Sequence, residues 1–203
     1  MRSLCFLIAA IPVFACADRL FFIPTGTKIR NDLIRLQFFS ETSDKGDRMV
    51  YVGTGILDSF DMEVIDERLR NGNDHVSLDF SYNAIPALPD ISPGISFGVN
   101  DSLGVTSLGF GAYGAITWRM YQTGEFNSDT PVDLTLGAGF GRRYRGLFVG
   151  VRLPFTNQFR LVVEHDSREI TAGFELKLDR DFMLMGMVRD FRTAFGASLQ
   201  MRF

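Results

Sequence analysis

The stretch TAFGASLQMRF, residues 193–203, indicates the fold class because its side chains alternate strictly between two kinds. Apolar residues fall on one face, and small or polar residues fall on the other. The apolar positions are Phe195, Ala197, Leu199, Met201 and Phe203. A repeat of two residues is typical of a β-strand whose faces meet two different environments. The stretch therefore predicts a strand with one apolar face.

The same alternation recurs along most of the chain. We expect further strands at residues 33–39, 49–56, 60–66, 75–85, 94–100, 108–121, 132–140, 147–153, 159–165, 170–178 and 182–189. A proline-rich segment at 86–93 cannot supply regular ladder donors and is expected to be a connection. No segment has the periodicity of a helix. The pattern predicts an all-β protein of about twelve strands, with ~10–14 as the range.

Composition limits the possible classes of protein. The chain has 203 residues, of which 46% are hydrophobic and 22% charged, with a net charge of −3. This size suits one domain, and this charge balance does not indicate a nucleic-acid partner. After residue 17 no apolar run reaches the ~18 residues that a transmembrane helix needs. A membrane-spanning form of this sequence would therefore have to be a closed barrel.

The first 17 residues, MRSLCFLIAAIPVFACA, have the features of a secretory signal peptide: a basic Arg2, an apolar stretch and a small-x-small ending. Cleavage after Ala17 would remove both cysteines, Cys5 and Cys16. The alternative is acylation of Cys16, because residues 13–16 resemble a lipobox, but the bulky Phe14 disfavours it. We expect residues 18–32 to form a periplasmic lead-in and residues 33–203 to form the barrel domain.

Alternation alone does not identify the environment of the apolar face. It suits either the core of a soluble periplasmic β-sandwich or the lipid-facing surface of a barrel. An even strand number brings both ends of the barrel domain to one side, and a terminal Phe203 is how bacterial outer-membrane barrels usually end. Polar turns before a Phe repeat at 57–62, 155–161 and 178–184, and we expect them on the periplasmic side. The favoured prediction is a closed antiparallel up-and-down transmembrane β-barrel in the cell outer membrane.

The barrel prediction assigns side chains to faces. We expect the lipid-facing positions to include Leu134, Leu136, Leu161, Val163, Phe174, Leu199 and Met201. The predicted lumen charges are Arg152, Arg160, Glu164, Glu175, Lys177 and Arg202. Aromatic residues expected at the membrane interfaces are Tyr51, Tyr82, Trp118, Tyr121 and Phe203. Glycines at 109, 111 and 114 are expected to leave one strand face nearly bare, where the backbone curves or the interior is narrow.

Residues 91–178 resemble the YjbH-like family of predicted outer-membrane barrels. The resemblance lies in a proline-led strand ending in Gly-x-x-Asp (98–101), a D-L-T-x-G-x-G strand (133–139) and an acidic E-[YH]-D motif (164–166). His165 stands where tyrosine is usual in that family. The family is associated with exopolysaccharide production and export. The resemblance therefore implies a barrel with a structural or export-related role in cell-surface polysaccharide.

Two clusters suggest other chemistry. His165, Asp166 and Ser167, with Glu164 beside them, are the candidates for a barrel hydrolase. Adjacent strand residues point to opposite faces, so His165 and Asp166 would not converge unless the strand has already ended. Arg142, Arg143 and Arg145 form a basic turn that is either simply solvated or in contact with anionic lipopolysaccharide. No motif indicates a metal or a cofactor.

The sequence thus predicts a non-enzymatic outer-membrane β-barrel whose charged lumen is either a narrow pore or packed shut. Its expected partners are outer-membrane lipid and the barrel-assembly machinery, with surface polysaccharide or export proteins as further candidates. Two alternatives stay open from the sequence. They are a soluble periplasmic β-protein that binds a partner, and an outer-membrane barrel hydrolase.

Overall fold

The computed structural model describes residues 19–42, 47–69, 73–121 and 130–203. The predicted signal peptide, including Cys16, lies outside these residues. The described chain forms twelve strands. They are β1 (Leu33–Glu41), β2 (Arg48–Ile56), β3 (Phe60–Arg68), β4 (Asp74–Ile85), β5 (Gly94–Asn100), β6 (Gly111–Met120), β7 (Val132–Gly141), β8 (Gly146–Pro154), β9 (Phe159–His165), β10 (Ile170–Lys177), β11 (Phe182–Arg189) and β12 (Arg192–Arg202).

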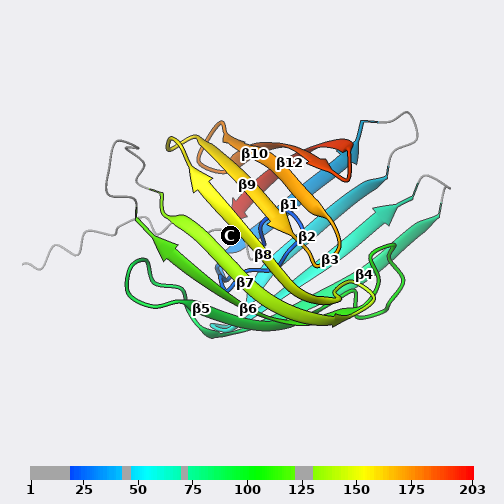
Figure 1. Cartoon of the computed structure of the whole chain (residues 1–203), viewed down its shortest axis with the longest axis horizontal. Coiled ribbons are helices and arrows are strands. Elements are labelled where there is room, and N and C mark those ends of the chain that lie inside the picture. The colour runs from blue at the N-terminus through cyan, green and yellow to red at the C-terminus, as the bar shows by residue number, and fades with distance from the viewer. Residues whose placement is uncertain (1–18, 43–46, 70–72, 122–129) are drawn as a thin grey trace, which may run out of the picture.

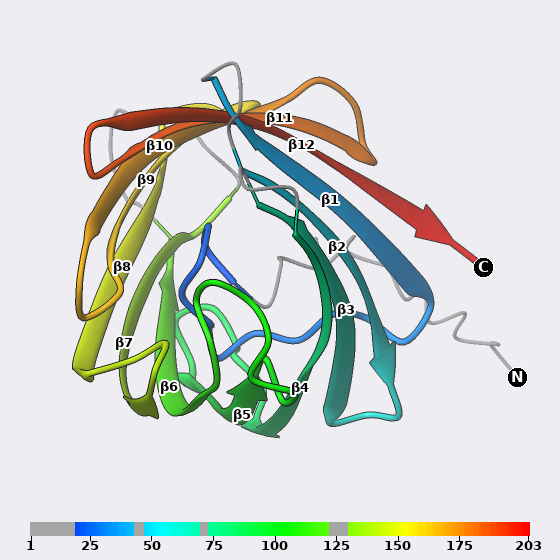
Figure 2. The same cartoon turned by 90° about the vertical axis from the view of Figure 1, so that its right-hand side faces the viewer.

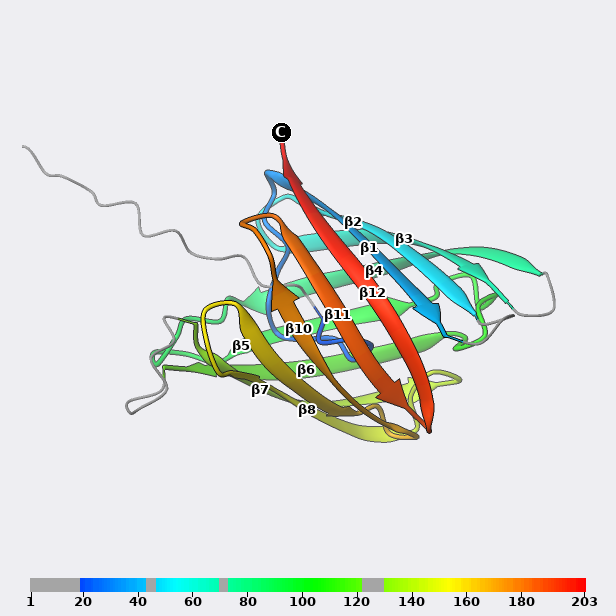
Figure 3. The same ribbon diagram turned by 90° about the horizontal axis from the view of Figure 1, so that it is seen from above.

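Each strand pairs in antiparallel fashion with its neighbours in sequence, and β12 pairs with β1 to close the barrel (Figures 1 and 3). The closing register places Leu33 opposite Arg202 and Glu41 opposite Ala194. The predicted closed antiparallel barrel is therefore confirmed. The alternative of a β-sandwich is wrong, because the single sheet closes on itself instead of forming two facing sheets.

The barrel has two different ends. At the end where β1 begins and β12 ends, here called the terminal end, strands β3, β9 and β11 begin at Phe60, Phe159 and Phe182. The three repeated polar turns therefore lie together at the terminal end. At the opposite end, Asp190 and Phe191 form the β11–β12 turn with φ of 45° and 61°. Positive φ at both positions gives a turn whose twist matches the flanking strands.

The outer surface of the barrel is apolar. Phe38 on β1, Val52 on β2 and Phe80 on β4 are 41–44% exposed. Of the positions predicted to face lipid, Leu134, Leu136, Val163, Phe174 and Met201 are exposed, and Leu161 and Leu199 are half-exposed. Among the described residues, no helix is both long and apolar enough to cross a membrane.

The interior contains a segment that does not belong to the sheet. Residues 19–27, here called the plug segment, run inside the ring of strands (Figure 2) and are buried. The sequence predicted these residues as a lead-in outside the barrel, and the structure places them in the lumen. Apolar Leu20, Phe21 and Ile23 explain the difference, because they bury their side chains among inward-facing aromatic and aliphatic residues.

Large inward side chains stand beside glycines. A Cβ on Gly137 would lie 2.1 Å from Cζ of Phe148, so the absence of a side chain makes room for that ring. Tyr51, predicted at a membrane interface, is instead fully buried in the lumen, where its ring packs edge-on against Phe39 at 6.1 Å. Gly114 lies against the ring of Phe97, whereas Gly109 precedes β6 in a loop, so the predicted bare face of three glycines is wrong.

Candidate functional site

The plug segment and the lumen wall around it form the candidate site. The backbone N–H of Leu20 donates to the carbonyl of Ile23 at 3.0 Å, which folds residues 20–23 into a tight turn. The turn directs consecutive backbone N–H groups toward β9. Such a row of amides is a favourable environment for an anion.

Glu164 on β9 is the acceptor for that turn. Its carboxylate accepts the N–H of Phe21 at 3.0 Å, of Phe22 at 3.0 Å and of Ile23 at 3.4 Å. Glu164 is 1% exposed, so all of these bonds lie in the interior. Backbone N–H groups in the interior need a partner, because a buried donor without one is costly. A single side chain of the wall therefore holds the backbone of the plug segment.

The side chain of Phe22 faces the end of the barrel opposite the terminal end. Its ring centroid lies 5.8 Å from that of Phe39, and the guanidinium of Arg189 lies 4.5 Å from the Phe22 ring centroid. Arg143 donates from Nη2 to the Phe22 carbonyl at 3.0 Å. Arg143 is therefore a buried lumen residue and not part of a fully solvated basic turn, while Arg142 and Arg145 are exposed.

Toward the terminal end the plug segment contacts the wall through its backbone. Gly26 donates its N–H to Thr117 Oγ1 at 2.7 Å, and Ser96 Oγ donates to the Thr25 carbonyl at 2.8 Å. A Cβ on Gly26 would lie 2.3 Å from the carbonyl oxygen of Gly94. Only glycine permits this approach of the two backbones.

A ladder of alternating charges lines the wall near the terminal end. Arg119 pairs with Asp133 at 2.9 Å, Asp133 with Arg152 at 3.3 Å, Arg152 with Glu175 at 3.0 Å, and Glu175 with Arg160 at 3.6 Å. We call these five residues the charge ladder. Arg152 also donates to the Arg19 carbonyl at 3.2 Å, which joins the ladder to the plug segment.

A second ionic group lies on the far wall. Glu63 on β3 forms ion pairs with Arg35 of β1 and with Arg19 of the plug segment. The Arg19 guanidinium also lies 4.2 Å from the ring centroid of Tyr51. Buried charges are tolerated when they are paired and hydrogen-bonded. Arg19 therefore anchors the start of the plug segment to the wall opposite Glu164.

The loop at residues 101–110 folds inward and narrows the mouth at the opposite end. Asp101 accepts hydrogen bonds from Val105 N at 3.0 Å, Thr106 N at 2.8 Å and Ser77 Oγ. Burial opposes its ionisation, but the hydrogen bonds from Ser77 and Thr106 outweigh burial, so the pKa of Asp101 lies below its usual value. Glu67 on β3 accepts the Ser107 N–H at 2.6 Å. The sequence predicted a strand from residue 108, but β6 begins only at Gly111.

Two open pockets lie at the two ends of the lumen. The pocket at the opposite end has a volume of about 320 Å³, and Phe22, Phe39 and Arg189 are among its lining residues. Phe22 also lines a cavity of about 10 Å³ beside Arg19 and Glu63. Such a cavity is at the lower limit for one water molecule. The plug segment therefore leaves little space for a solute at this level of the lumen.

The other pocket opens at the terminal end and has a volume of about 370 Å³. It lies between the β8–β9 and β10–β11 turns. Among the predicted lumen charges, Arg160 and Lys177 line this pocket. Arg152, Glu164 and Glu175 are buried in the lumen, whereas Arg202 is exposed at the terminal end of β12.

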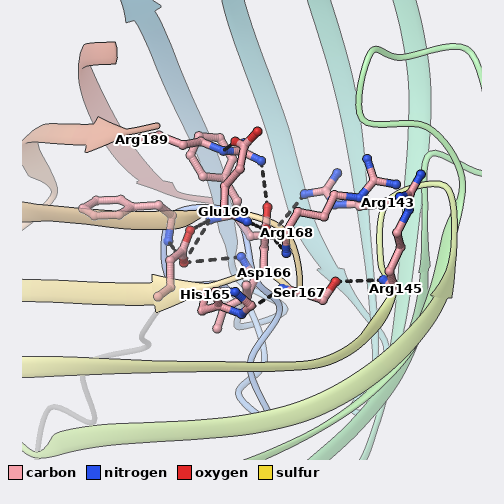
Figure 4. Close-up of polar contacts among 12 residues, drawn as sticks. Arg143, Arg145, His165, Asp166, Ser167, Arg168, Glu169 and Arg189 are labelled. Atoms are coloured by element: carbon pink, nitrogen blue, oxygen red, sulfur yellow. Dashed lines mark hydrogen bonds and ion pairs between the residues drawn. The ribbon is translucent and has the colours of Figure 1, made fainter. Parts of the chain in front are cut away.

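The candidate catalytic residues do not assemble into a nucleophile and base. Figure 4 shows His165 at the end of β9 and Ser167 in the turn that follows. His165 Nδ1 accepts the backbone N–H of Ser167 at 3.3 Å, and Ser167 Oγ accepts the backbone N–H of Arg145 at 2.8 Å. Asp166 accepts the N–H of Glu169 at 2.9 Å and pairs with Arg189 at 2.7 Å. Glu164 faces the plug segment, so these residues stabilise a turn and a lumen contact.

Metal chemistry has no candidate in the described part of the chain, where no group of three or more His, Cys, Asp or Glu side chains could hold an ion. Sequence reasoning missed Arg19, Arg35, Glu63 and Asp133 as lumen charges. Glu63 and Asp133 alternate with apolar residues on their strands, so the alternation that assigns side chains to the two faces predicts them as inward-facing charges.

Of the comparisons with known proteins, the search of solved structures supports the fold. No family model matches the chain, and no curated protein matches its sequence. Two solved structures of the KdgM porin are similar to it, one of them in complex with disordered oligogalacturonate. Their TM-scores are 0.53 and 0.54, and each is 14% identical, covering 84% of this chain and 99% of the KdgM chain. At this level of identity the similarity concerns the fold of the barrel alone.

Proposed function

We propose that the chain is a non-enzymatic outer-membrane β-barrel whose lumen is closed by its own N-terminal segment. The observation that carries the proposal is the plug segment, which is buried inside a barrel with an apolar outer surface. A closed barrel satisfies all of its strand hydrogen bonds internally, so it can cross a lipid bilayer. An apolar exterior with a charged interior is the polarity expected of such a barrel.

Conduction through this barrel requires displacement of the plug segment. Displacement must break the bonds of Glu164 to three backbone N–H groups, the bond of Arg152 to Arg19 and the close contact of Gly26 with Gly94. The loop at 101–110 narrows the other mouth. The protein is therefore proposed to be shut in its ground state and to admit small polar solutes only when the plug segment moves.

The more specific part of the proposal is an export-related role in the production of surface exopolysaccharide. It is supported by the resemblance of residues 91–178 to the YjbH-like family. A KdgM structure in complex with oligogalacturonate also shows that a barrel of similar fold can hold a saccharide. Deletion of the gene should lower the amount of surface polysaccharide, and the wild-type gene should restore it. Unchanged polysaccharide in the deletion strain would contradict this part alone.

Fractionation and gel migration test the barrel part of the proposal. We expect recovery in the outer membrane and a shift in migration between unheated and boiled samples. Recovery as a soluble periplasmic protein would refute the membrane location. The variants His165→Ala and Ser167→Ala should keep the heat-dependent shift. Their rate of hydrolysis of test substrates should equal that of the wild type.

Single-channel recording in planar bilayers tests closure by the plug segment. The wild type should remain mostly closed. A variant in which a Gly/Ser sequence of equal length replaces residues 19–27 should conduct, because it keeps chain length and loses the contacts of the plug segment. A heat-dependent gel shift for the variant shows that its barrel has formed. Equal conductance of the two proteins would refute closure by this segment.

A further inference from the structure

We propose that the pocket at the terminal end, here called the terminal pocket, binds an anionic sugar unit carrying a carboxylate or a phosphate. Its polar lining residues include Thr130, Asn157, Gln158, Arg160, Lys177 and Arg180. The proposal goes beyond closure of the lumen, because a ligand can reach this pocket while the plug segment stays in place. A pocket of about 370 Å³ lies within the ~300–1,000 Å³ typical of small-molecule sites.

The position of Arg160 supplies the first argument. Arg160 is the last residue of the charge ladder and lines the terminal pocket. Its ion-pair partner Glu175 is shared with Arg152. A guanidinium carries five N–H donors, so Arg160 can also bind an anion in this pocket.

The geometry around Arg160 is the second argument. Glu175 lies 3.0 Å from Arg152 but 3.6 Å from Arg160, so the closer ion pair belongs to Arg152. Arg160 is mostly buried, and among the described residues its Nε has no hydrogen-bond partner. A buried N–H without a partner is costly. A ligand carboxylate or phosphate oxygen would satisfy it, with Lys177 as a second cation in the same pocket.

Rigid turns hold the other lining groups. The Lys177 N–H donates to the Gln158 carbonyl at 2.7 Å and ties the β10–β11 side of the pocket to the β8–β9 turn. Within that turn Thr156 Oγ1 accepts the N–H of Gln158 at 3.2 Å and of Phe159 at 2.9 Å. Asp179 is turned toward its own loop, where it accepts the Arg180 N–H at 2.6 Å. Pre-organised groups lose less entropy when a ligand binds.

Neutral hydrogen-bonding groups favour a sugar over a simple anion. Asn157 and Gln158 carry side-chain amides, and Thr130 carries a hydroxyl. Amides both donate and accept, which suits the hydroxyl groups of a sugar ring. Two or three cations with several neutral polar groups therefore predict a ligand with one negative group and several hydroxyls.

Calorimetric titration of the folded barrel in detergent tests this proposal and needs neither membrane location nor an open lumen. The probes are glucuronate, glucose 6-phosphate, glucose and acetate. We expect one or both anionic sugars to bind saturably, with glucose and acetate at least ~10-fold weaker, because each lacks one of the two kinds of recognised group. The tighter anionic sugar identifies the preferred charge. Failure of both to bind, or equally tight binding of acetate, would overturn the proposal.

Variants locate the binding. Arg160→Gln and Lys177→Gln should each weaken the binding of the anionic sugars by ~10-fold or more, since each removes a charged partner. Arg68→Gln is the matched control, because Arg68 is an exposed cation at the opposite end, paired with Asp74. Should Arg160→Gln fail to show the heat-dependent gel shift, Lys177→Gln and Arg180→Gln carry the test. Unchanged affinity in these variants would place the ligand elsewhere.

Discussion

Glu164 is the residue on which the position of the plug segment most depends, because its carboxylate receives three backbone N–H groups in the interior. Replacing it by alanine should loosen the segment by ~1–3 kcal/mol, the usual cost of leaving buried hydrogen-bond donors without a partner. The loss corresponds to a ~5- to 150-fold increase in the open population. Maleimide labelling of Thr25→Cys, a buried position of the plug segment, measures it.

The control for this prediction is Asp74→Ala in the same Thr25→Cys background. Asp74 is an exposed carboxylate paired with Arg68, remote in sequence from β9. Labelling in the control should match that of Thr25→Cys alone. If Glu164→Ala labelled no faster than the control, the carboxylate would not be what retains the segment.

Arg152 is the centre of the charge ladder, since it contacts Asp133, Glu175 and the Arg19 carbonyl. Arg152→Met leaves both carboxylates near the interior without their closest shared cation. Breaking a buried ion pair from one side typically costs ~3–5 kcal/mol. Urea unfolding in lipid vesicles should show a loss of that size. Arg68→Met, at an exposed pair, should show no resolvable change, and equal losses in both variants would contradict the buried ladder.

At the scale of elements, the sequence predicts all twelve strands because the residues on each strand alternate between an apolar exterior and a mixed interior. The alternation fails at Tyr51 and Phe148, where both faces of the strand are apolar and only the packing shows which ring points inward. The plug segment has no period at all. Its run of consecutive apolar residues at 20–23 was nevertheless a signal of burial.

The candidate site was less predictable than the strands, because it depends on contacts between distant parts of the chain. The bond from Phe22 to Glu164 joins residues 142 positions apart. Face assignment identified Arg152, Glu164 and Glu175 as inward charges, but their partners follow only from the barrel register. The inward path of the loop at 101–110 likewise depends on Glu67, on a strand that no local pattern connects to it.

The loop at 101–110 should respond to acid. The pKa of Asp101 is lowered in the folded state, so its contribution to stability is present above the unfolded pKa and is lost as pH falls through the folded value. A spin label at Leu103→Cys should stay restricted at neutral pH and become mobile only in acid, below the ordinary range for a carboxyl. Asp101→Ala should be mobile at every pH. A label in the wild type that becomes mobile near pH 6–7 would contradict this anchoring, since an aspartate of lowered pKa is ionised there.

At the scale of the whole molecule, the barrel reverses the polarity of a soluble protein. Its interior holds Arg35, Glu63 and the charge ladder, whereas large apolar side chains cover its exterior. A contiguous apolar surface around a closed barrel is costly in water and favourable in a bilayer. We therefore expect the loss in free energy of unfolding caused by an added outward-facing charge to depend on its height along the barrel axis.

Leu136 and Leu147 make that comparison on adjacent strands. Leu136 lies in the middle of β7 and Leu147 near the start of β8, and both side chains are exposed on the outer surface. An arginine at mid-bilayer depth costs ~2–4 kcal/mol, falling to ~0–1 near the interface. Leu136→Arg should therefore destabilise the barrel by the larger amount in lipid vesicles, and Leu147→Arg by the smaller. Equal losses of stability in the two variants would be inconsistent with a bilayer centred at the height of Leu136. A difference that persisted in water without lipid or detergent would trace the effect to packing within the protein.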